Sequence, residues 1–155
     1  MIKNNNTIII SHRGYENGED NLLENNPMQI QKMLYNNIQV EIDVFYRENN
    51  FFLGHDEPKY QIDINFLKQK GLWCHAKNLE SFEKMLENNI HCFWHQQDDF
   101  ALTSKGFIWT YPNKGLTNIS ICVLNDQILK EIPKCFGICT DYPFLYKRME
   151  DCKCG

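Results

Sequence analysis

The chain has 155 residues, 23% of them charged, and a formal net charge of −4 at pH 7. This length suits one domain with a hydrophobic core, so we treat residues 1–155 as a single domain in which 151–155 form a frayed tail. The acidic balance and the absence of a Lys or Arg run argue against nucleic-acid binding, which normally needs a basic stripe. No apolar run approaches the ~20 residues that cross a bilayer, and the N-terminal apolar stretch is too short for a signal peptide. We therefore expect a cytoplasmic protein without a membrane span.

Short apolar runs of strand length recur along the chain and predict β-strands. Several of them are nearly continuous rather than alternating, which is typical of strands covered on both faces. The runs are Thr7–Ser11, Gln39–Val44, Phe51–Gly54, Leu72–Ala76, His91–His95, Phe107–Thr110, Ile119–Leu124 and Gly137–Thr140.

Amphipathic stretches between some of these runs predict helices. The spacing of apolar residues favours helices over 22–36 and 78–89, and Asn78 or Ser81 is a suitable cap for the second. Two shorter helices are predicted over Gln127–Lys134 and Pro143–Asp151.

Strands that alternate with helices indicate an α/β barrel, although such a barrel usually needs ~250 residues. The segments Asp98–Gly106 and Asn113–Asn118 leave no room for ordinary helices, and Phe45–Asn50 is short enough for a hairpin. We therefore predict a reduced, irregular TIM (β/α)8-type barrel with several outer helices missing. The alternative is an open sheet that closes only in a homodimer.

Two carboxylates lie two residues apart in the second predicted strand. Because side chains alternate along a strand, Glu41 and Asp43 share one face while Val40, Ile42 and Val44 share the other. Two carboxylates in one low-dielectric space repel each other unless a cation lies between them, and oxygen ligands suit Mg²⁺ or Ca²⁺. A solvated strand end, with each acid paired to a basic residue, is the alternative interpretation.

Two histidines follow predicted strands, in His12-Arg13-Gly14 and Gly54-His55-Asp56. The carboxyl ends of barrel strands are where α/β barrels build active sites. A histidine is suited to proton transfer near neutral pH, and the Arg13 guanidinium can bind a phosphate through two hydrogen bonds. Glu24 is expected to begin the first long helix and to support the loop that carries His12 and Arg13.

These motifs occur in one order along the chain, from His-Arg-Gly and Glu-Asn through Glu-x-Asp-Val and Gly-His-Asp to a closing Gly-Ile-x-Thr-Asp-x-Pro. The ordered set resembles the glycerophosphodiester phosphodiesterase family from Ile8 to Pro143. The resemblance implies a TIM barrel and metal-dependent cleavage of glycerophosphodiesters to glycerol phosphate and an alcohol. By the same resemblance His12 and His55 are the acid/base pair, Glu41 and Asp43 bind the cation, and Arg13 and Lys77 bind the phosphate.

The fourth predicted strand departs from the family pattern. Its sequence is Cys74-His75-Ala76-Lys77, so His75 stands where the family usually has a glutamate ligand. Strand alternation still places His75 and Lys77 on one face. We expect one divalent metal ion, Mg²⁺ or Ca²⁺ in first place; a His75 ligand would favour Mn²⁺ or Zn²⁺ instead. A buried core histidine is the alternative role for His75.

Further residues complete the predicted site. His95 is a candidate substrate contact, and Trp109 and Tyr111 are candidates for an apolar wall, although aromatic residues at such positions often serve packing alone. The sequence thus predicts a phosphoric diester hydrolase that acts on a small-molecule phosphodiester. The alternatives are a catalytically inactive phosphate-ester-binding protein and a phosphodiesterase for a nucleotide or sugar-phosphate diester.

Overall fold

The structure, a computed structural model, describes residues 6–153; the predictions that concern residues 1–5, Cys154 and Gly155 lie outside this range. The described residues form ten strands and four helices. In chain order these are β1 (Ile8–His12), α1 (Pro27–Tyr35), β2 (Gln39–Arg47), β3 (Asn50–Leu53), β4 (Tyr60–Ile62), α2 (Ile64–Leu67), β5 (Leu72–Ala76), α3 (Leu79–Glu87), β6 (Cys92–Phe93), β7 (Phe100–Leu102), β8 (Ile108–Thr110), β9 (Ser120–Asn125), β10 (Gly137–Thr140) and α4 (Pro143–Lys153).

Every predicted strand is present, and three of the four predicted helices are confirmed as α1, α3 and α4. Helix α3 is capped by Asn78, whose side chain accepts from the Ser81 N–H in a capping box. Helix α1 begins later than predicted, at Pro27, because Asn26 caps it and proline suits the first helical position. Helix α4 continues to Lys153, so the first three residues of the predicted tail are helical.

The helix predicted over Gln127–Lys134 is wrong, because this segment is irregular. The hydroxyl of Tyr146 in α4 accepts from the Leu129 N–H at 2.8 Å and donates to the Gln127 carbonyl at 3.0 Å. A side chain from α4 therefore satisfies backbone groups that a helix would have used.

All strands belong to one mixed sheet built around β2. The strand order is β4-β3-β2-β1-β10-β9-β8-β7, and β5 branches from β2 and carries β6. On one edge of β2, residues 40–44 pair in parallel with β5. The other edge pairs in parallel with β1 at residues 39–41 and, further along, antiparallel with β3 at residues 44–47. The hairpin predicted between the second and third strands is confirmed by the β2–β3 pairing.

The predicted TIM-type barrel is wrong. The sheet curls but stays open, since no strand ladder joins β6 to β7 in the described residues, and β3, β4 and β7 run antiparallel to their neighbours. Between β8, β9 and β10 the chain returns to parallel pairing through irregular loops instead of helices. The short connections explain this outcome, because a complete barrel needs a covering helix after each strand.

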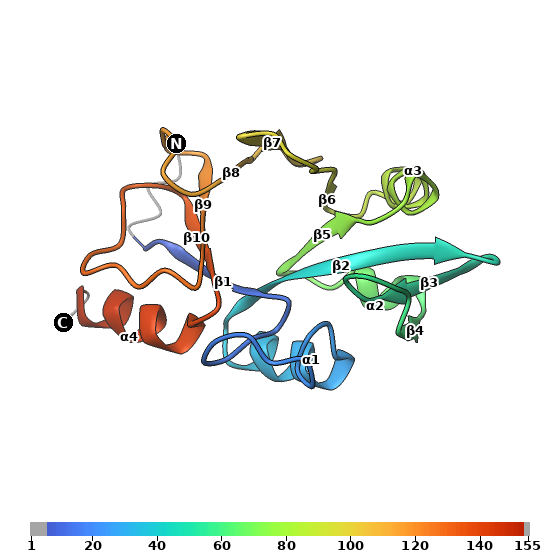
Figure 1. Ribbon diagram of the computed structural model, residues 1–155, viewed down its shortest axis with the longest axis horizontal. Coiled ribbons are helices and arrows are strands. Elements are labelled where there is room, and N and C mark those ends of the chain that lie inside the picture. The colour runs from blue at the N-terminus through green and yellow to red at the C-terminus, as the bar shows by residue number, and fades with distance from the viewer. Residues whose placement is uncertain (1–5, 154–155) are drawn as a thin grey trace.

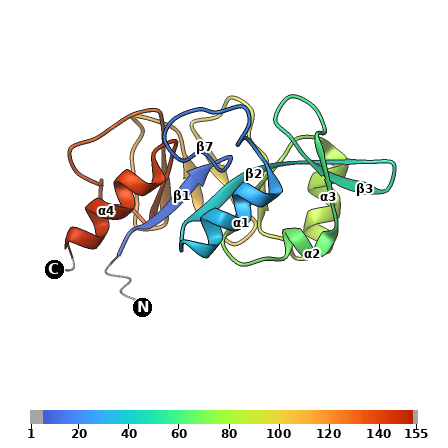
Figure 2. The same cartoon turned by 90° about the horizontal axis from the view of Figure 1, so that it is seen from below.

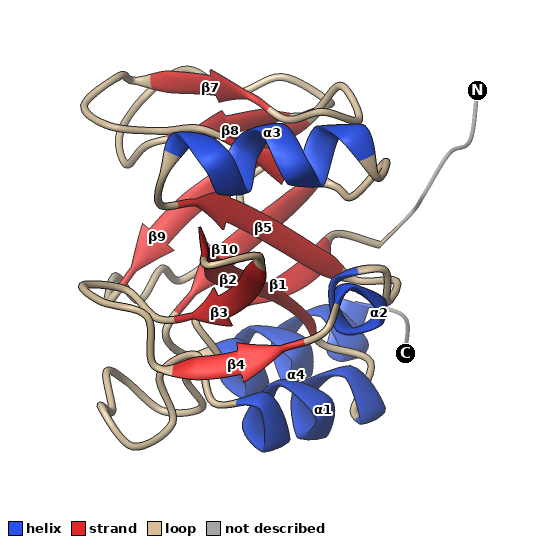
Figure 3. Ribbon diagram, turned by 90° about the vertical axis from the view of Figure 1, so that its right-hand side faces the viewer, coloured by secondary structure: helices blue, strands red, loops and turns tan. Residues whose placement is uncertain are grey.

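The helices cover only parts of the outer face of the sheet. Figures 1 and 3 show α1 and α4 along one flank, with α3 on another flank beyond β5. Seen from below in Figure 2, α1 lies against β2 and α4 lies near β1. None of the helices in residues 6–153 is long and apolar enough to cross a membrane.

Side-chain alternation divides the molecule into an outer core and an inner face. Val40, Ile42 and Val44 of β2 point outward into an apolar cluster that also holds Ile30 and Met33 of α1. A second cluster lies on the inner face of the curled sheet and includes Ile10, Trp73 and Val123. Two residues further along the same strands, the inner face becomes polar, at His12, His75 and Asn125. The apolar inner cluster therefore leads directly into the polar site.

We predict that Ile30→Ala lowers the free energy of unfolding by about 2–5 kcal/mol, the range for removing a fully buried aliphatic side chain. Ile30 is 0% exposed, and alanine keeps the helix propensity of α1, so the loss isolates packing. Met28→Ala on the same helix is the matched control, since Met28 is 83% exposed, and it should change stability by about 0.5 kcal/mol or less. Chemical denaturation of both variants measures the difference; equal effects would contradict this assignment of the core.

His91 predicts a pH dependence of stability. Its Nε2 lies 2.9 Å from Thr103 Oγ1 and its ring packs on Trp73. Burial, assisted by the charge of Lys105, lowers the pKa of His91 from 6.5 to about 4. The unfolded chain therefore takes up a proton that the folded chain resists, and stability falls as the pH drops from about 6.5 to about 4.

Replacing His91 by Gln should remove this contribution. The stability of the parent protein relative to His91→Gln is then expected to decline over that pH interval, as measured by denaturation at a series of pH values. A difference that stays constant with pH would show that His91 titrates alike in the folded and unfolded chains.

Candidate active site

Strand register brings the predicted acids and histidines together. His12 of β1 lies opposite Glu41 of β2, and Asp43 lies opposite His75 of β5. Residues in register on parallel neighbours present their side chains on the same face of the sheet. The predicted metal ligands Glu41, Asp43 and His75 each offer a ligand atom, and these atoms lie within 4.8 Å of one another. The three residues can therefore hold a metal ion.

The two carboxylates have oxygen atoms that no protein group satisfies. Glu41 is 3% exposed and Asp43 is 0% exposed. Glu41 Oε2 and Asp43 Oδ1 are buried and lack a hydrogen-bond partner within the described residues. Because an unpaired buried carboxylate oxygen is costly, this arrangement fits a cation held between the two side chains.

The other oxygen of Asp43 is fully engaged. The Asn25 amide donates to Asp43 Oδ2 at 2.9 Å, and the Asp43 N–H donates to Asn25 Oδ1 at 2.9 Å. Arg13 Nε lies 3.1 Å from the same Oδ2. These contacts fix the carboxylate so that Oδ1 faces His75 Nδ1 at 3.2 Å and Lys77 Nζ at 3.8 Å.

The two acids differ in their electrostatic environments. Burial raises the pKa of Glu41, and the neighbouring Asp43 carboxylate raises it further, against smaller opposing effects of His12, His75 and Arg13. Burial also opposes ionisation of Asp43, but the close approach of His75 and the charge of Arg13 prevail and lower the pKa of Asp43. Asp43 is therefore the anionic centre of the site, and Glu41 is the acid that lacks a close cation.

His12 is oriented by an acid that the sequence analysis quoted in a motif but gave no role. His12 Nδ1 lies 2.7 Å from Oδ1 of Asp141, which follows β10, and His12 Nε2 lies 4.0 Å from Glu41 Oε2. Burial lowers the pKa of His12, but the hydrogen bond to Asp141 and the charge of Glu41 outweigh it, so the net effect is a raised pKa. Asp141 thus leaves one nitrogen of His12 free toward Glu41 and the cavity.

Arg13 is held between two carboxylates. Its Nη1 donates to Glu24 Oε1 at 3.0 Å, and the Tyr15 hydroxyl donates to the same oxygen at 2.7 Å. The prediction that Glu24 begins the first helix is wrong, because Glu24 lies in a turn before the Asn26 cap. Its predicted support of the Arg13 loop is confirmed by these contacts.

His55 approaches the site from the loop after β3. Its Nδ1 lies 2.8 Å from Asp56 Oδ1, and its side chain is 31% exposed. The loop turns back so closely that a Cβ on Gly54 would lie 1.9 Å from the Glu57 carbonyl oxygen, which excludes any other residue without rearrangement. Glycine is therefore required for the path that brings His55 to the cavity.

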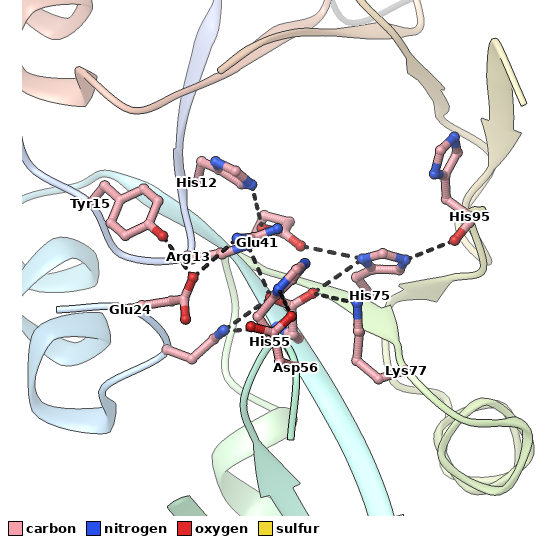
Figure 4. Close-up of polar contacts among 12 residues, drawn as sticks. His12, Arg13, Tyr15, Glu24, Glu41, His55, Asp56, His75, Lys77 and His95 are labelled. Carbon is pink, nitrogen blue, oxygen red and sulfur yellow. Dashed lines mark hydrogen bonds and ion pairs between the residues drawn. The ribbon is translucent and has the colours of Figure 1, made fainter. Parts of the chain in front are cut away.

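The site opens into a cavity of about 430 Å³ at the carboxyl ends of the strands. Most of the predicted site residues line it, whereas Asp43 and Glu24 are not among the lining residues. Figure 4 shows His12, His55, His75 and Lys77 converging around Glu41. The cavity is lined by His12, Arg13, Glu41, His55, His75, Lys77, His95, Gln96, Trp109, Tyr111, Val123 and Asn125.

His95 and Trp109, predicted as possible substrate contacts, both line the cavity, but the His95 ring has no free nitrogen. The Asp98 carbonyl accepts from His95 Nε2 at 2.7 Å, and the Tyr111 hydroxyl donates to His95 Nδ1 at 2.8 Å. Because a carbonyl can only accept, Nε2 carries a proton, and in the neutral ring Nδ1 accepts from the Tyr111 hydroxyl. Trp109 stacks on Phe93 at 4.6 Å, so its main contact is packing.

No role is predicted from the sequence for Asn25 or Asp141, and Tyr111 is predicted only as part of an apolar wall. The sequence does indicate that Asn25 and Asp141 belong to the site, since Asn25 lies in the Glu-Asn motif and Asp141 in the closing Gly-Ile-x-Thr-Asp-x-Pro motif. The contact of Tyr111 with His95 depends on how the loop after β6 folds, and no local pattern indicates it.

No protein-family model matches the chain, and no curated protein or solved structure is significantly similar to it.

We predict that Asn25→Ala lowers the free energy of unfolding by about 1–3 kcal/mol, because it leaves the buried Asp43 N–H unsatisfied and removes a donor from the carboxylate. Thermal and chemical unfolding measure the loss. Asn26→Ala is a neighbouring control that removes a helix cap without touching Asp43. A loss of stability in Asn25→Ala confined to acidic pH, where Asp43 is protonated, would contradict the role proposed for Asn25.

Proposed function

We propose that the protein is a metal-dependent phosphodiesterase that cleaves glycerophosphodiesters or similar small phosphodiesters by paired-histidine acid/base catalysis. One observation carries the proposal. His12, His55, Arg13 and Lys77 line the same cavity as Glu41, and the buried carboxylates of Glu41 and of Asp43 beside it each have an oxygen without a hydrogen-bond partner in the described residues. This combination can promote cleavage of a phosphodiester, because it offers proton transfer at both ends of the reaction and positive charge at the phosphate.

His12 is suited to proton transfer from a fixed position. Asp141 holds Nδ1, so the ring cannot turn away, and Nε2 is directed to the cavity side near Glu41. A histidine oriented by a carboxylate at one nitrogen can accept or donate a proton at the other. We assign His12 to proton transfer at Nε2.

His55 is suited to proton transfer from the opposite, more exposed side. Asp56 binds its Nδ1 and leaves Nε2 for the substrate. The two histidines come from different strand ends, β1 and the loop after β3, and both line the cavity. One can remove a proton from the attacking hydroxyl while the other protonates the departing alkoxide.

Positive charge for the phosphoryl oxygens is supplied by Arg13 and Lys77. Arg13 is immobilised by Glu24 and Asp43, and Lys77 lies beside Asp43 at the cavity wall. Charges fixed before the reaction stabilise a phosphorane-like transition state without a cost of reorganisation. A divalent cation held by Glu41, Asp43 and His75 would add Lewis-acid polarisation of the phosphate and of a neighbouring hydroxyl.

A binding protein for phosphate esters is the second candidate. It is favoured by the ion pairs of Asp43 with Arg13, His75 and Lys77, which already balance part of the negative charge. Orientation of His12 by Asp141 favours the enzyme instead, because binding alone has no need for an oriented proton-transfer group.

Phosphorus NMR of the purified protein with a panel of glycerophosphodiesters, nucleotide diesters and sugar-phosphate diesters tests the proposal. We expect loss of the diester signal that depends on added divalent metal and stops with chelator. The product signal distinguishes direct hydrolysis from a cyclic phosphate. Binding without turnover across the panel, with Mg²⁺, Mn²⁺ and Zn²⁺ each tried, would contradict the enzyme and support the binding protein.

We predict that His12→Ala and Glu41→Ala each lower turnover by ~100-fold or more, the usual effect of losing an acid/base group or a metal ligand. Met28→Ala, on the exposed face of α1, is the control and should retain full turnover. Circular dichroism confirms that each variant is folded. Near-parental rates in the folded His12 and Glu41 variants would contradict the assigned site.

A further inference from the structure

We infer that Glu41, Asp43 and His75 form a site selective for a divalent transition metal such as Zn²⁺, Co²⁺ or Mn²⁺ over Mg²⁺ and Ca²⁺. The inference rests on the proposed function only in using the same cavity, since metal binding is measurable without substrate. In the part of the chain that the structure describes, this is the one group of three such side chains whose ligand atoms converge.

His75 presents a nitrogen ligand in the correct tautomer. Its Nε2 lies 3.2 Å from the His95 carbonyl oxygen, which can only accept, so Nε2 carries a proton. In the neutral ring the lone pair is then on Nδ1, which lies 3.2 Å from Asp43 Oδ1 and 3.8 Å from Glu41 Oε1. Metal-binding histidines are typically held in this way, by a carbonyl at the second nitrogen.

The plane of the ring is also fixed. The His75 imidazole stacks on Phe93 with an interplanar angle of 4° and a centroid distance of 5.1 Å. Its lone pair therefore points into the space between the two carboxylates without rotation of the side chain. An imidazole held in this way binds Zn²⁺, Co²⁺ or Mn²⁺ more favourably than it binds Mg²⁺ or Ca²⁺.

The carboxylates offer few oxygens, which disfavours the hard cations. Asn25 and Arg13 occupy Asp43 Oδ2, so Asp43 can contribute Oδ1 alone. Ca²⁺ takes six to eight oxygen ligands, often from bidentate carboxylates, and Mg²⁺ requires octahedral oxygen coordination. Three protein ligands that include an imidazole, with a position left open, are typical of catalytic zinc sites.

The positive charges beside Asp43 also disfavour Mg²⁺ and Ca²⁺. Lys77 Nζ lies 3.8 Å from Asp43 Oδ1, and Arg13 neutralises part of the same carboxylate. These cations weaken the purely electrostatic attraction on which a hard ion depends. Affinity must then come mainly from a directed bond to the His75 nitrogen.

The test is a titration of the full chain with Co²⁺, followed by d–d absorption and calorimetry. The titration uses a variant with Cys152→Ser and Cys154→Ser. These substitutions remove the exposed Cys152 thiol and the thiol of Cys154, two residues further on, which could bind Co²⁺ or Zn²⁺ as thiolates. We expect one equivalent of Co²⁺ to bind, displaced by stoichiometric Zn²⁺ and retained in a large excess of Mg²⁺ or Ca²⁺.

His75→Glu tests the role of the nitrogen ligand. It replaces the imidazole with a third carboxylate, so Co²⁺ affinity should fall by about tenfold or more while Mg²⁺ and Ca²⁺ begin to compete. His91→Gln is the matched control, because His91 lies outside the cavity lining, and its Co²⁺ affinity should equal that of the parent. Should His75→Glu not fold, the competition experiment on the parent decides alone.

Three results overturn the inference: displacement of Co²⁺ by Mg²⁺ or Ca²⁺ at comparable concentration, unchanged Co²⁺ affinity in folded His75→Glu, or no bound metal. A protein that binds Co²⁺ as expected but cleaves no diester overturns the proposed function and leaves this inference standing. If instead Mg²⁺ binds selectively and supports cleavage, this inference is overturned and the proposed function stands.

Discussion

Two carboxylates on one face of one strand, Glu41 and Asp43, set the requirement on which the rest of the site depends. They are buried side by side, and each keeps an oxygen without a hydrogen-bond partner in the described chain. Burial of like charges is unfavourable unless cationic groups or a metal ion compensate it. Arg13, Lys77 and His75 surround Asp43, whereas within residues 6–153 no cationic group lies nearer to Glu41 than His75 at 3.8 Å. The surrounding cationic groups thus compensate Asp43 more fully than Glu41, and together with His75 the pair could hold a metal ion.

The sheet turns this requirement into a defined geometry. Parallel pairing of β2 with β1 and with β5 fixes His12 beside Glu41 and His75 beside Asp43. The apolar half of the inner face, with Trp73 and Val123, supports these residues from below. The irregular hairpins and loops leave the carboxyl ends of the strands accessible, so the cavity stays open above the carboxylates. A closed barrel is not needed for this arrangement, because it depends on the strands next to β2.

Much of this could be predicted from the sequence, and the physical reason is locality. The alternation of Glu41 and Asp43 with Val40, Ile42 and Val44 depends on neighbouring residues alone, and the structure confirms it. The barrel prediction failed because sheet closure depends on long-range pairing, and three-residue strands such as β4 and β7 carry almost no pattern. Likewise Asp141 is 129 residues from His12, so their contact follows from the β1–β10 register and not from any local motif. The contacts that occupy both nitrogens of His95, with the Asp98 carbonyl and the Tyr111 hydroxyl, depend on the conformation of the loop after β6 and also cannot be predicted from a local motif.

The central claim is that the carboxylate pair and His75 bind one divalent metal ion. A crystal structure of the protein grown with Mn²⁺, with anomalous data collected at the manganese edge, tests it most directly. We expect a single strong anomalous peak within about 2.0–2.3 Å of a Glu41 carboxylate oxygen, Asp43 Oδ1 and His75 Nδ1. A map without that peak, in which His75 Nδ1 donates to Asp43 and water satisfies Glu41, would contradict it.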